Sequence, residues 1–227
     1  MPEQGQQLLL RLVILLSALL ALPAAAQSPL RIAIIIDDLG YSLYLGQQAI
    51  ELPGALTYSI LPQLRYSSII ARRAHKRGKE VMLHLPMQTT DGRALGPGGL
   101  HQALSRAEFA RQVRVNLATV PHVAGVNNHM GSLLTRDPGA MRWLMQELRC
   151  FDDLYFVDSR TDIRTVAREY ARDAGLAHAA RDVFLDNQQN PDYVRSQLGV
   201  LIARAREHGT AIGIGHPYPT TLAVLAE

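Results

Sequence analysis

Seven short apolar runs, separated by segments with helical periodicity, recur along the chain between residues 31 and 216. Each run is short and apolar enough to form one strand that is buried on both faces of a sheet. The runs span residues 31–37, 56–61, 80–85, 123–128, 154–159, 181–186 and 211–216. Strands that alternate with helices indicate repeated βα units and a parallel sheet. The pattern therefore predicts an α/β fold, either an open doubly wound sheet or a closed or nearly closed barrel.

The segments between the runs carry helix start and stop signals. A capping box, or a capping residue before a proline, satisfies the free backbone N–H groups at the start of a helix. These start signals are Ser105 with Glu108, Asp137-Pro138 and Asn190-Pro191. Gly78 and Gly209 follow basic residues, as is typical of helix C-termini. Residues 89–99 form the one long Gly-rich loop, which is either simply exposed or flanks a substrate.

The N-terminus differs from the rest of the chain. Arg11 precedes an apolar run over residues 12–22, and three alanines follow at 24–26. This pattern is typical of a secretory signal peptide, because an apolar run of about 11 residues is too short for a membrane span of roughly 20. We predict a signal peptide at 1–26 and an exported protein, periplasmic or extracellular, with no stable membrane span after cleavage. Residues 27–227 show no linker and are predicted to form a single domain.

The composition argues against nucleic-acid binding and rules out a disulfide within the chain. The chain has 227 residues and a net charge of +3, with basic residues spread along its length. The sequence has no basic run with interleaved aromatic residues, so nucleic-acid binding is not predicted. Cys150 is the only cysteine, so no disulfide can form within the chain.

Polar residues gather where the predicted strands end. The strand ends carry Asp37-Asp38, His84, Asn127-Asn128-His129, Asp158-Ser159-Arg160, Asp186-Asn187 and His216. In parallel α/β folds these ends meet on one face, where binding and catalytic sites are built. The remaining histidines, among them His178, fall in predicted helices or loops and are interpreted as surface or capping residues.

The adjacent carboxylates of Asp37 and Asp38 favour a metal site. Two neighbouring carboxylates repel each other unless a cation or a proton lies between them. Imidazole and carboxylate ligands without a thiolate favour zinc, with nickel, cobalt, manganese and iron as alternatives. A catalytic zinc keeps one position open, which leaves three protein ligands and frees the other acid and imidazole for proton transfer. For Asp158 and Asp186, capping of the next helix is an equally good interpretation.

The strand-end motifs resemble the divergent polysaccharide deacetylase family, a branch of the carbohydrate esterases. The motifs are "DDLG" (37–40), "HLPM" (84–87), "NNHMGS" (127–132), "VDS" (157–159) and "GIGHPYPTT" (213–221). Their order and spacing extend the resemblance over about residues 30–225. It implies a distorted (β/α) barrel of about seven parallel strands. Since relatives continue beyond the helix in which this chain ends, the resemblance also implies a shortened C-terminus.

The resemblance also implies roles for individual residues. Asp37 is expected to be the catalytic base and Asp38 a metal ligand, as in the first motif of related esterases. His84 matches the first histidine of their His-x-x-x-His motif, but Gln88 occupies the position of the second. We therefore expect His129 to be the third ligand.

The remaining site predictions concern the leaving group and the substrate. By the same resemblance, His216 in the last motif is expected to be the general acid. The Arg-Pro-Pro-Tyr stretch of related esterases has no match in this chain, so its roles stay unassigned. Asn128, Asp158 and Arg160 are predicted to contact the substrate.

These residues predict an exported metal-dependent hydrolase that removes N- or O-acetyl groups from a cell-envelope polysaccharide. The departure at Gln88 and the missing stretch leave an alternative open, an inactive deacetylase-fold module that binds a glycan or an envelope protein. An aspartyl phosphatase fits poorly, because the second carboxylate of its Asp-x-Asp motif would fall on Leu39.

Overall fold

The computed structural model describes residues 29–227, so the predicted signal peptide at 1–26 lies outside the described residues. Eight strands form one sheet in the order β6-β5-β4-β3-β2-β1-β8-β7, and all paired strands are parallel. They are β1 (Arg31–Leu39), β2 (Thr57–Ile60), β3 (Glu80–Met87), β4 (Val123–Met130), β5 (Tyr155–Asp158), β6 (Ala177–Ala180), β7 (Val183–Phe184) and β8 (Thr210–Gly215).

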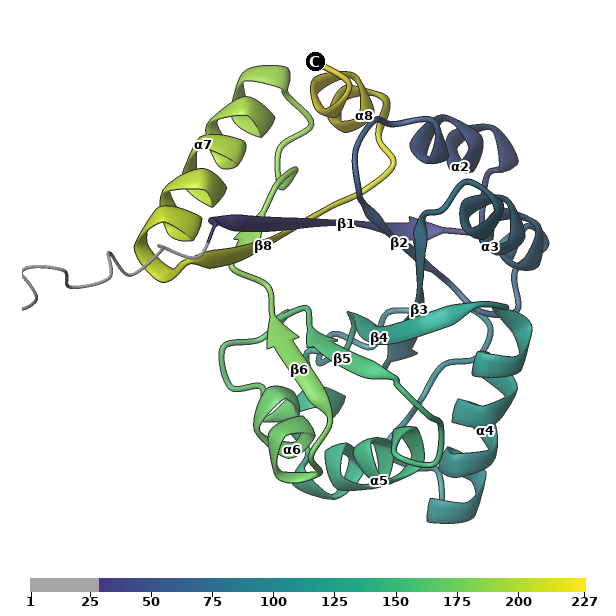
Figure 1. Ribbon diagram of the computed structural model, residues 1–227. Helices are drawn as coiled ribbons and strands as arrows, with labels where there is room; N and C mark the ends of the chain where they lie inside the picture. The colour runs from purple at the N-terminus through teal and green to yellow at the C-terminus, as the bar shows by residue number, and fades with distance from the viewer. Residues whose placement is uncertain (1–28) are drawn as a thin grey trace, which may run out of the picture.

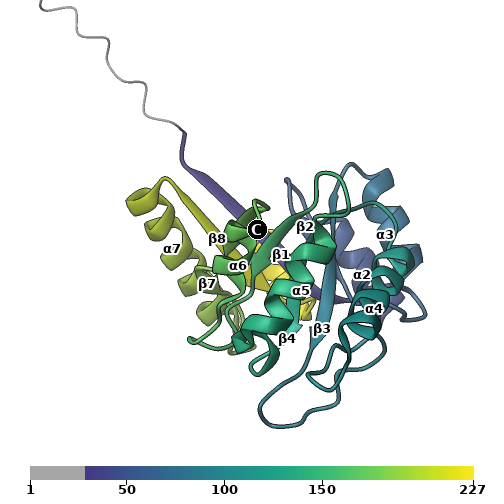
Figure 2. The same cartoon turned by 90° about the horizontal axis from the view of Figure 1, so that it is seen from below.

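The sheet curls into a half-barrel with helices around its outside (Figure 1). The helices are α2 (Leu43–Ile50), α3 (Ser67–Lys76), α4 (Arg106–Thr119), η1 (Leu134–Arg136), α5 (Pro138–Leu148), α6 (Ala167–Asp173), α7 (Pro191–His208) and α8 (Pro219–Leu225). In the second view, α7 lies at the left of the molecule and α3 and α4 lie at the right (Figure 2). The predicted α/β barrel is confirmed, in its distorted form with an opening between β6 and β7.

The strand prediction is wrong in two places. The run at 181–186 forms only the two-residue strand β7, and the four residues of β6 were not predicted at all. His178 consequently lies in a strand rather than in a helix or loop. The sequence of β6 is Ala-His-Ala-Ala, which lacks the β-branched and aromatic residues that mark a strand.

The predicted helix ends are confirmed. Ser105 and Glu108 form the capping box of α4. Asp137 and Asn190 accept hydrogen bonds from the first N–H groups of α5 and α7. Gly209 ends α7 with a φ of 81°, a left-handed conformation that glycine adopts without steric penalty. None of the described helices is long and apolar enough to cross a membrane.

Alternation along the strands separates two cores. Ile36 and Leu83 belong to the large core between the strands and the helices. A small cluster inside the half-barrel contains Ile35, Met82, Val157 and Ile214. Because strand side chains alternate with a period of two, the next inward positions are Asp37, His84, Ser159 and His216. The apolar cluster is thus the floor on which a polar layer is built.

A glycine makes room for an aromatic ring at the other end of the half-barrel. The Tyr155 hydroxyl donates to Glu80 Oε1 at 2.6 Å, and a Cβ atom on Gly125 would lie only 2.5 Å from the Tyr155 ring. The substitution Gly125→Ala is therefore expected to destabilise the protein by about 1–3 kcal/mol, because the ring must move or clash. Chemical denaturation would measure this loss.

The matched control is Gly199→Ala in α7, where a Cβ atom would meet nothing within 4 Å. Alanine replaces glycine in a helix there, so the protein should gain up to about 1 kcal/mol. Equal effects of the two substitutions would contradict the packing of Tyr155 against Gly125.

Candidate functional site

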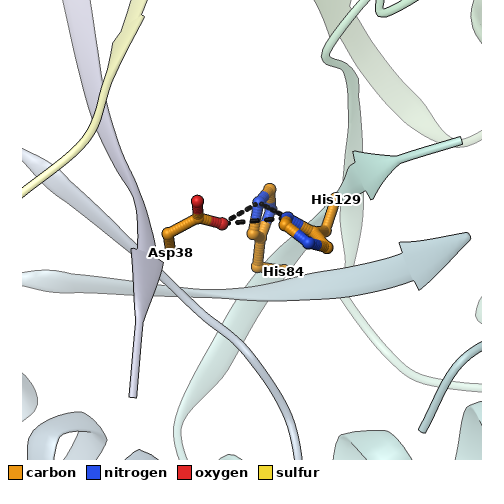
Figure 3. A group of neighbouring side chains, drawn as sticks. All are labelled: Asp38, His84 and His129. Atoms are coloured by element: carbon orange, nitrogen blue, oxygen red, sulfur yellow. Dashed lines mark hydrogen bonds and ion pairs between the residues drawn. The ribbon is translucent and has the colours of Figure 1, made fainter. Parts of the chain in front are cut away.

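Asp38, His84 and His129 bring three metal-ligating atoms together at the carboxyl ends of β1, β3 and β4 (Figure 3). Asp38 Oδ1 lies 2.9 Å from His129 Nδ1 and 3.2 Å from His84 Nε2. The two imidazole nitrogens lie 3.1 Å from each other. The structure thus groups the three residues that the sequence nominates as metal ligands, including His129 from a separate strand.

This triangle of atoms fits a divalent cation. Bonds of about 2.0–2.1 Å in a tetrahedral zinc site place neighbouring ligand atoms about 3.3 Å apart. Asp38 Oδ1 is buried, and the two imidazole nitrogens near it make no well-aligned hydrogen bond to it within residues 29–227. A buried acceptor without a partner is unfavourable unless a donor or a cation faces it. The donor set and the unused oxygen both match a bound cation.

A change in the backbone at the end of β1 aims Asp38 at this group. Neighbouring strand residues normally point to opposite faces, so Asp37 and Asp38 would diverge. The register of β1 with β2 shifts between Ile36 and Leu39, and Asp38 adopts a φ of 57°. A bulge re-aims a side chain, and aspartate tolerates the left-handed region better than most residues. Both carboxylates therefore lie within 3.6 Å of His84 Nε2.

Asn127 on β4 orients Asp37 and His84 at the same time. Its Nδ2 donates to Asp37 Oδ1 at 2.8 Å, which turns its Oδ1 toward His84 Nδ1 at 2.7 Å. Because that oxygen can only accept, His84 must carry a proton on Nδ1. The lone pair or the second proton of His84 is then on Nε2, the atom that faces Asp38. Such an outer contact fixes the tautomer of a metal-binding histidine.

Burial and charge oppose each other in this cluster. Burial raises the pKa of Asp37, and the attraction of His84 only partly offsets this. Burial alone would also raise the pKa of Asp38, but the imidazoles of His129 and His84 lower it below its usual range. Burial would lower the pKa of His84, yet the carboxylates of Asp37 and Asp38 raise it to about 9. A cation that binds His84 Nε2 must therefore displace a proton at neutral pH.

His216 at the end of β8 faces the same group from the other side. Its Nε2 lies 3.6 Å from Asp38 Oδ2, and its Nδ1 lies 2.9 Å from Asp186 Oδ1. Burial works against the charged imidazole, but the contact with Asp186 raises the pKa of His216 above its ordinary value. Thr221 Oγ1 also donates to Asp186, so the carboxylate is held in place.

The helix-cap interpretation of Asp186 is wrong. Helix α7 begins at Pro191 and its N-cap is Asn190, whose side chain accepts from Asp192 N and Tyr193 N. Asp186 instead accepts from the backbone N–H and the ring of His216.

Comparison with known sequences places the chain in a family. The family described as divergent polysaccharide deacetylase matches residues 34–227. The chain belongs to the divergent polysaccharide deacetylase family. It is 37% identical over 217 residues to the uncharacterized protein YibQ of Escherichia coli (strain K12), covering 96% of this chain and 67% of that protein. An uncharacterized protein of Haemophilus influenzae is 37% identical over 195 residues, which are 86% of this chain and 69% of the relative.

A solved structure has the same fold. The crystal structure of an uncharacterized protein from Agrobacterium tumefaciens C58 is similar with a TM-score of 0.83 and 22% sequence identity. The likeness covers 90% of this chain and 84% of that chain. The curled parallel sheet with outer helices is therefore shared with that protein.

Gln88 takes no part in the group formed by Asp38, His84 and His129. Its Oε1 accepts from Gln102 N at 2.8 Å, and its carbonyl oxygen accepts from the N–H groups of Leu133 and Leu134. The side chain thus ties the end of β3 to neighbouring loops. His129 is the residue that stands beside His84 instead.

The three residues predicted to contact the substrate lie at the ends of β4 and β5. Asn128 is buried and holds Ser159 N and Met130 O through its amide. Asp158 accepts from Arg160 N and Thr165 Oγ1, which stabilises the loop after β5. The side chains of Asn128 and Asp158 thus stabilise the backbone, whereas Arg160 is exposed. Substrate contact remains a prediction for all three residues.

Sequence reasoning noted Asn127 and Asp186 as strand-end residues without assigning either a role in the site, and it missed Arg181. Asn127 shares a strand face with His129, a signal that the period of two could have revealed. The guanidinium of Arg181 donates to Ser159 O and Arg160 O and lies 4.9 Å from the Phe184 ring. Only the pairing of β6 and β7 with distant strands brings Arg181 to the polar layer.

The contacts of Asn127 predict an effect on metal affinity. Asn127→Ala removes the acceptor that holds His84 Nδ1–H, so zinc affinity should fall by roughly 10–100-fold. Titration with zinc against a competing chelator would measure this change.

Asn128→Ala provides the matched control. This neighbouring amide contacts Ser159 N after β5 and Met130 O at the end of β4, and these contacts do not involve His84. The variant should lose folding stability but keep its zinc affinity. An Asn127→Ala protein that binds zinc as tightly as the wild type would contradict the orienting role of Asn127.

Proposed function

We propose that the protein is an exported, zinc-dependent hydrolase that removes N- or O-acetyl groups from a cell-envelope polysaccharide. Membership of the divergent polysaccharide deacetylase family supports a carbohydrate substrate. The observation that carries the proposal is the convergence of Asp38, His84 and His129 between Asp37 and His216. A cation held by these three ligands would supply Lewis acidity to the acetyl carbonyl and to the attacking water.

Asp37 suits the role of general base. It is 3% exposed, and burial raises its pKa toward the range in which a carboxylate accepts a proton effectively. The amide of Asn127 holds one carboxylate oxygen and leaves the other near His84 Nε2 at 3.6 Å. Asp37 would take the proton of the attacking water at this second oxygen.

His216 suits the role of general acid. Asp186 accepts from Nδ1 and leaves Nε2 directed at the group around Asp38. The charge of Asp186 favours the protonated imidazole, which can then give a proton from Nε2 to the departing amine or alcohol oxygen. Base and acid thus flank the three proposed ligands.

Zinc and export rest on separate supports. Two imidazoles and one carboxylate form a common donor set for zinc and leave a position for water. Export is supported by the signal-peptide pattern of residues 1–26.

The alternative of an inactive binding module is favoured by one observation, the engagement of Gln88 with a neighbouring loop rather than with the ligand group.

Metal removal and one substitution test the proposal. The purified protein should contain about one zinc and hydrolyse acetylated chitooligosaccharides, acetylated xylan or an aryl acetate. Chelation should abolish hydrolysis, and added zinc should restore it. Asp37→Asn should retain the metal and lower kcat by roughly 10²–10⁴-fold, because it removes the base.

Asp152→Asn, at an exposed position before β5, should keep full activity as the control. Protein that contains no metal and hydrolyses none of these substrates would exclude the hydrolase. In that event, glycan binding that survives Asp37→Asn would establish the binding module.

The contact between Asp186 and His216 predicts a pH effect. The raised pKa keeps His216 protonated, and the acid therefore active, to higher pH. Asp186→Asn removes the favourable charge, so the pKa of His216 should fall toward its ordinary value near 6.5. The alkaline limb of the kcat/KM profile should then move to lower pH, with a larger loss of activity at pH 8 than at pH 6.

Asp182→Asn is the control for this profile, because Asp182 contacts Ile212 N near the other end of β8. An unchanged alkaline limb in Asp186→Asn, with normal folding, would remove His216 from the role of general acid.

A further inference from the structure

A polar cavity lies between β6, α6 and the loop that joins β5 to α6. Its volume is about 440 Å³. Arg160, Arg168, Arg172 and His178 line it, together with Ile163 and the carboxylates of Asp158 and Glu169. None of the four basic residues is used by the proposed hydrolysis.

Arginines outnumber carboxylates in this cavity by three to two. Neither Arg160 nor Arg168 forms an ion pair within residues 29–227, and Arg172 pairs only with its exposed neighbour Asp173 at 3.0 Å. An exposed pair of this kind is worth little. The carboxylate of Asp158 already accepts two hydrogen bonds from the β5–α6 loop. Arginine guanidinium groups are therefore left to bind an anion that enters from solvent.

Two hydrogen bonds hold the loop that carries Arg160 against the end of β4, where His129 lies. Ser159 N donates to Asn128 Oδ1 at 2.8 Å, and Thr161 Oγ1 donates to Met130 O at 2.7 Å. These contacts join the residues on either side of Arg160 to the residues on either side of His129. A ligand bound at His129 can therefore continue toward Arg160 along the same loop.

We propose that this cavity binds a carboxylate or phosphate group carried by the substrate glycan. Arginine suits both groups, because its planar guanidinium makes paired, charge-assisted hydrogen bonds to them. Ile163 at the rim is 94% exposed and offers an apolar contact to the C–H face of a sugar ring. The proposal rests on the proposed function and narrows its substrate class to anionic polysaccharides.

Backbone amide NMR of the zinc-loaded protein tests the site directly. Inorganic phosphate or glucuronate should shift the amide signals of Arg160 and Arg168 saturably, whereas neutral glucose should not. High ionic strength should weaken the effect. Saturation by glucuronate alone indicates a uronic acid type of substituent, and saturation by phosphate alone indicates a phosphorylated glycan. If neither anion shifts these signals, the anion site does not exist.

Substitutions separate this proposal from the hydrolase proposal. The double variant Arg168→Gln/Arg172→Gln should bind the effective anion roughly tenfold more weakly, because two charge-assisted contacts are lost. It should hydrolyse a neutral aryl acetate at the wild-type rate. The double variant Arg204→Gln/Arg206→Gln on α7 removes the same charge from another helix and should bind normally. Equal binding by both double variants would overturn the assignment, whatever the outcome of the chelation experiment.

Discussion

The two-residue periodicity of the curled sheet determines what each strand contributes to the interior of the half-barrel. Positions that follow one another at this interval share a face, so an apolar cluster at Ile35, Met82, Val157 and Ile214 places the next residues inward as well. Those next residues are polar, and they come from strands far apart in the sequence. The site is therefore the continuation of a packed core, and the rigid floor beneath it limits how far its side chains can move.

The polar layer above this apolar cluster also requires its charges to be balanced. Asp37 and Asp38 are adjacent, and Asp37 is almost fully buried, so their repulsion is not screened by water. The imidazoles of His84 and His129 provide the compensating charge, which explains why the pKa values of Asp38 and His84 move in opposite directions. A cation in place of the His84 proton would serve the same purpose, and the unused oxygen of Asp38 is oriented for it.

Much of the fold could be predicted because buried parallel strands and helix caps are local patterns. The chain segments of β1, β3 and β4 and the caps at Ser105, Asp137 and Asn190 follow directly from neighbouring residues. Strand β6 could not be predicted, because its alanines carry no strand preference and pair only through the register with β5.

The candidate site also contains some residues that the sequence could predict and others that it could not. Asp37, Asp38 and the strand-end histidines were visible as residues that follow apolar runs. The roles of Asn127 and Asp186 depend on partners 43 and 30 positions away in the chain, and no local pattern reveals such pairings. The left-handed backbone of Asp38 was equally hidden, although it decides that both carboxylates face one cluster.

The unclosed sheet has a consequence for association between molecules. Its two edges are β6 and β7, which are four and two residues long. An unpaired edge is a template on which a strand of another chain can form backbone hydrogen bonds, and the number of such bonds grows with the length of the edge. A closed barrel avoids this hazard because it has no edge. In this half-barrel the edges are so short that they offer an incoming strand very few hydrogen bonds, which protects the sheet from edge-to-edge aggregation.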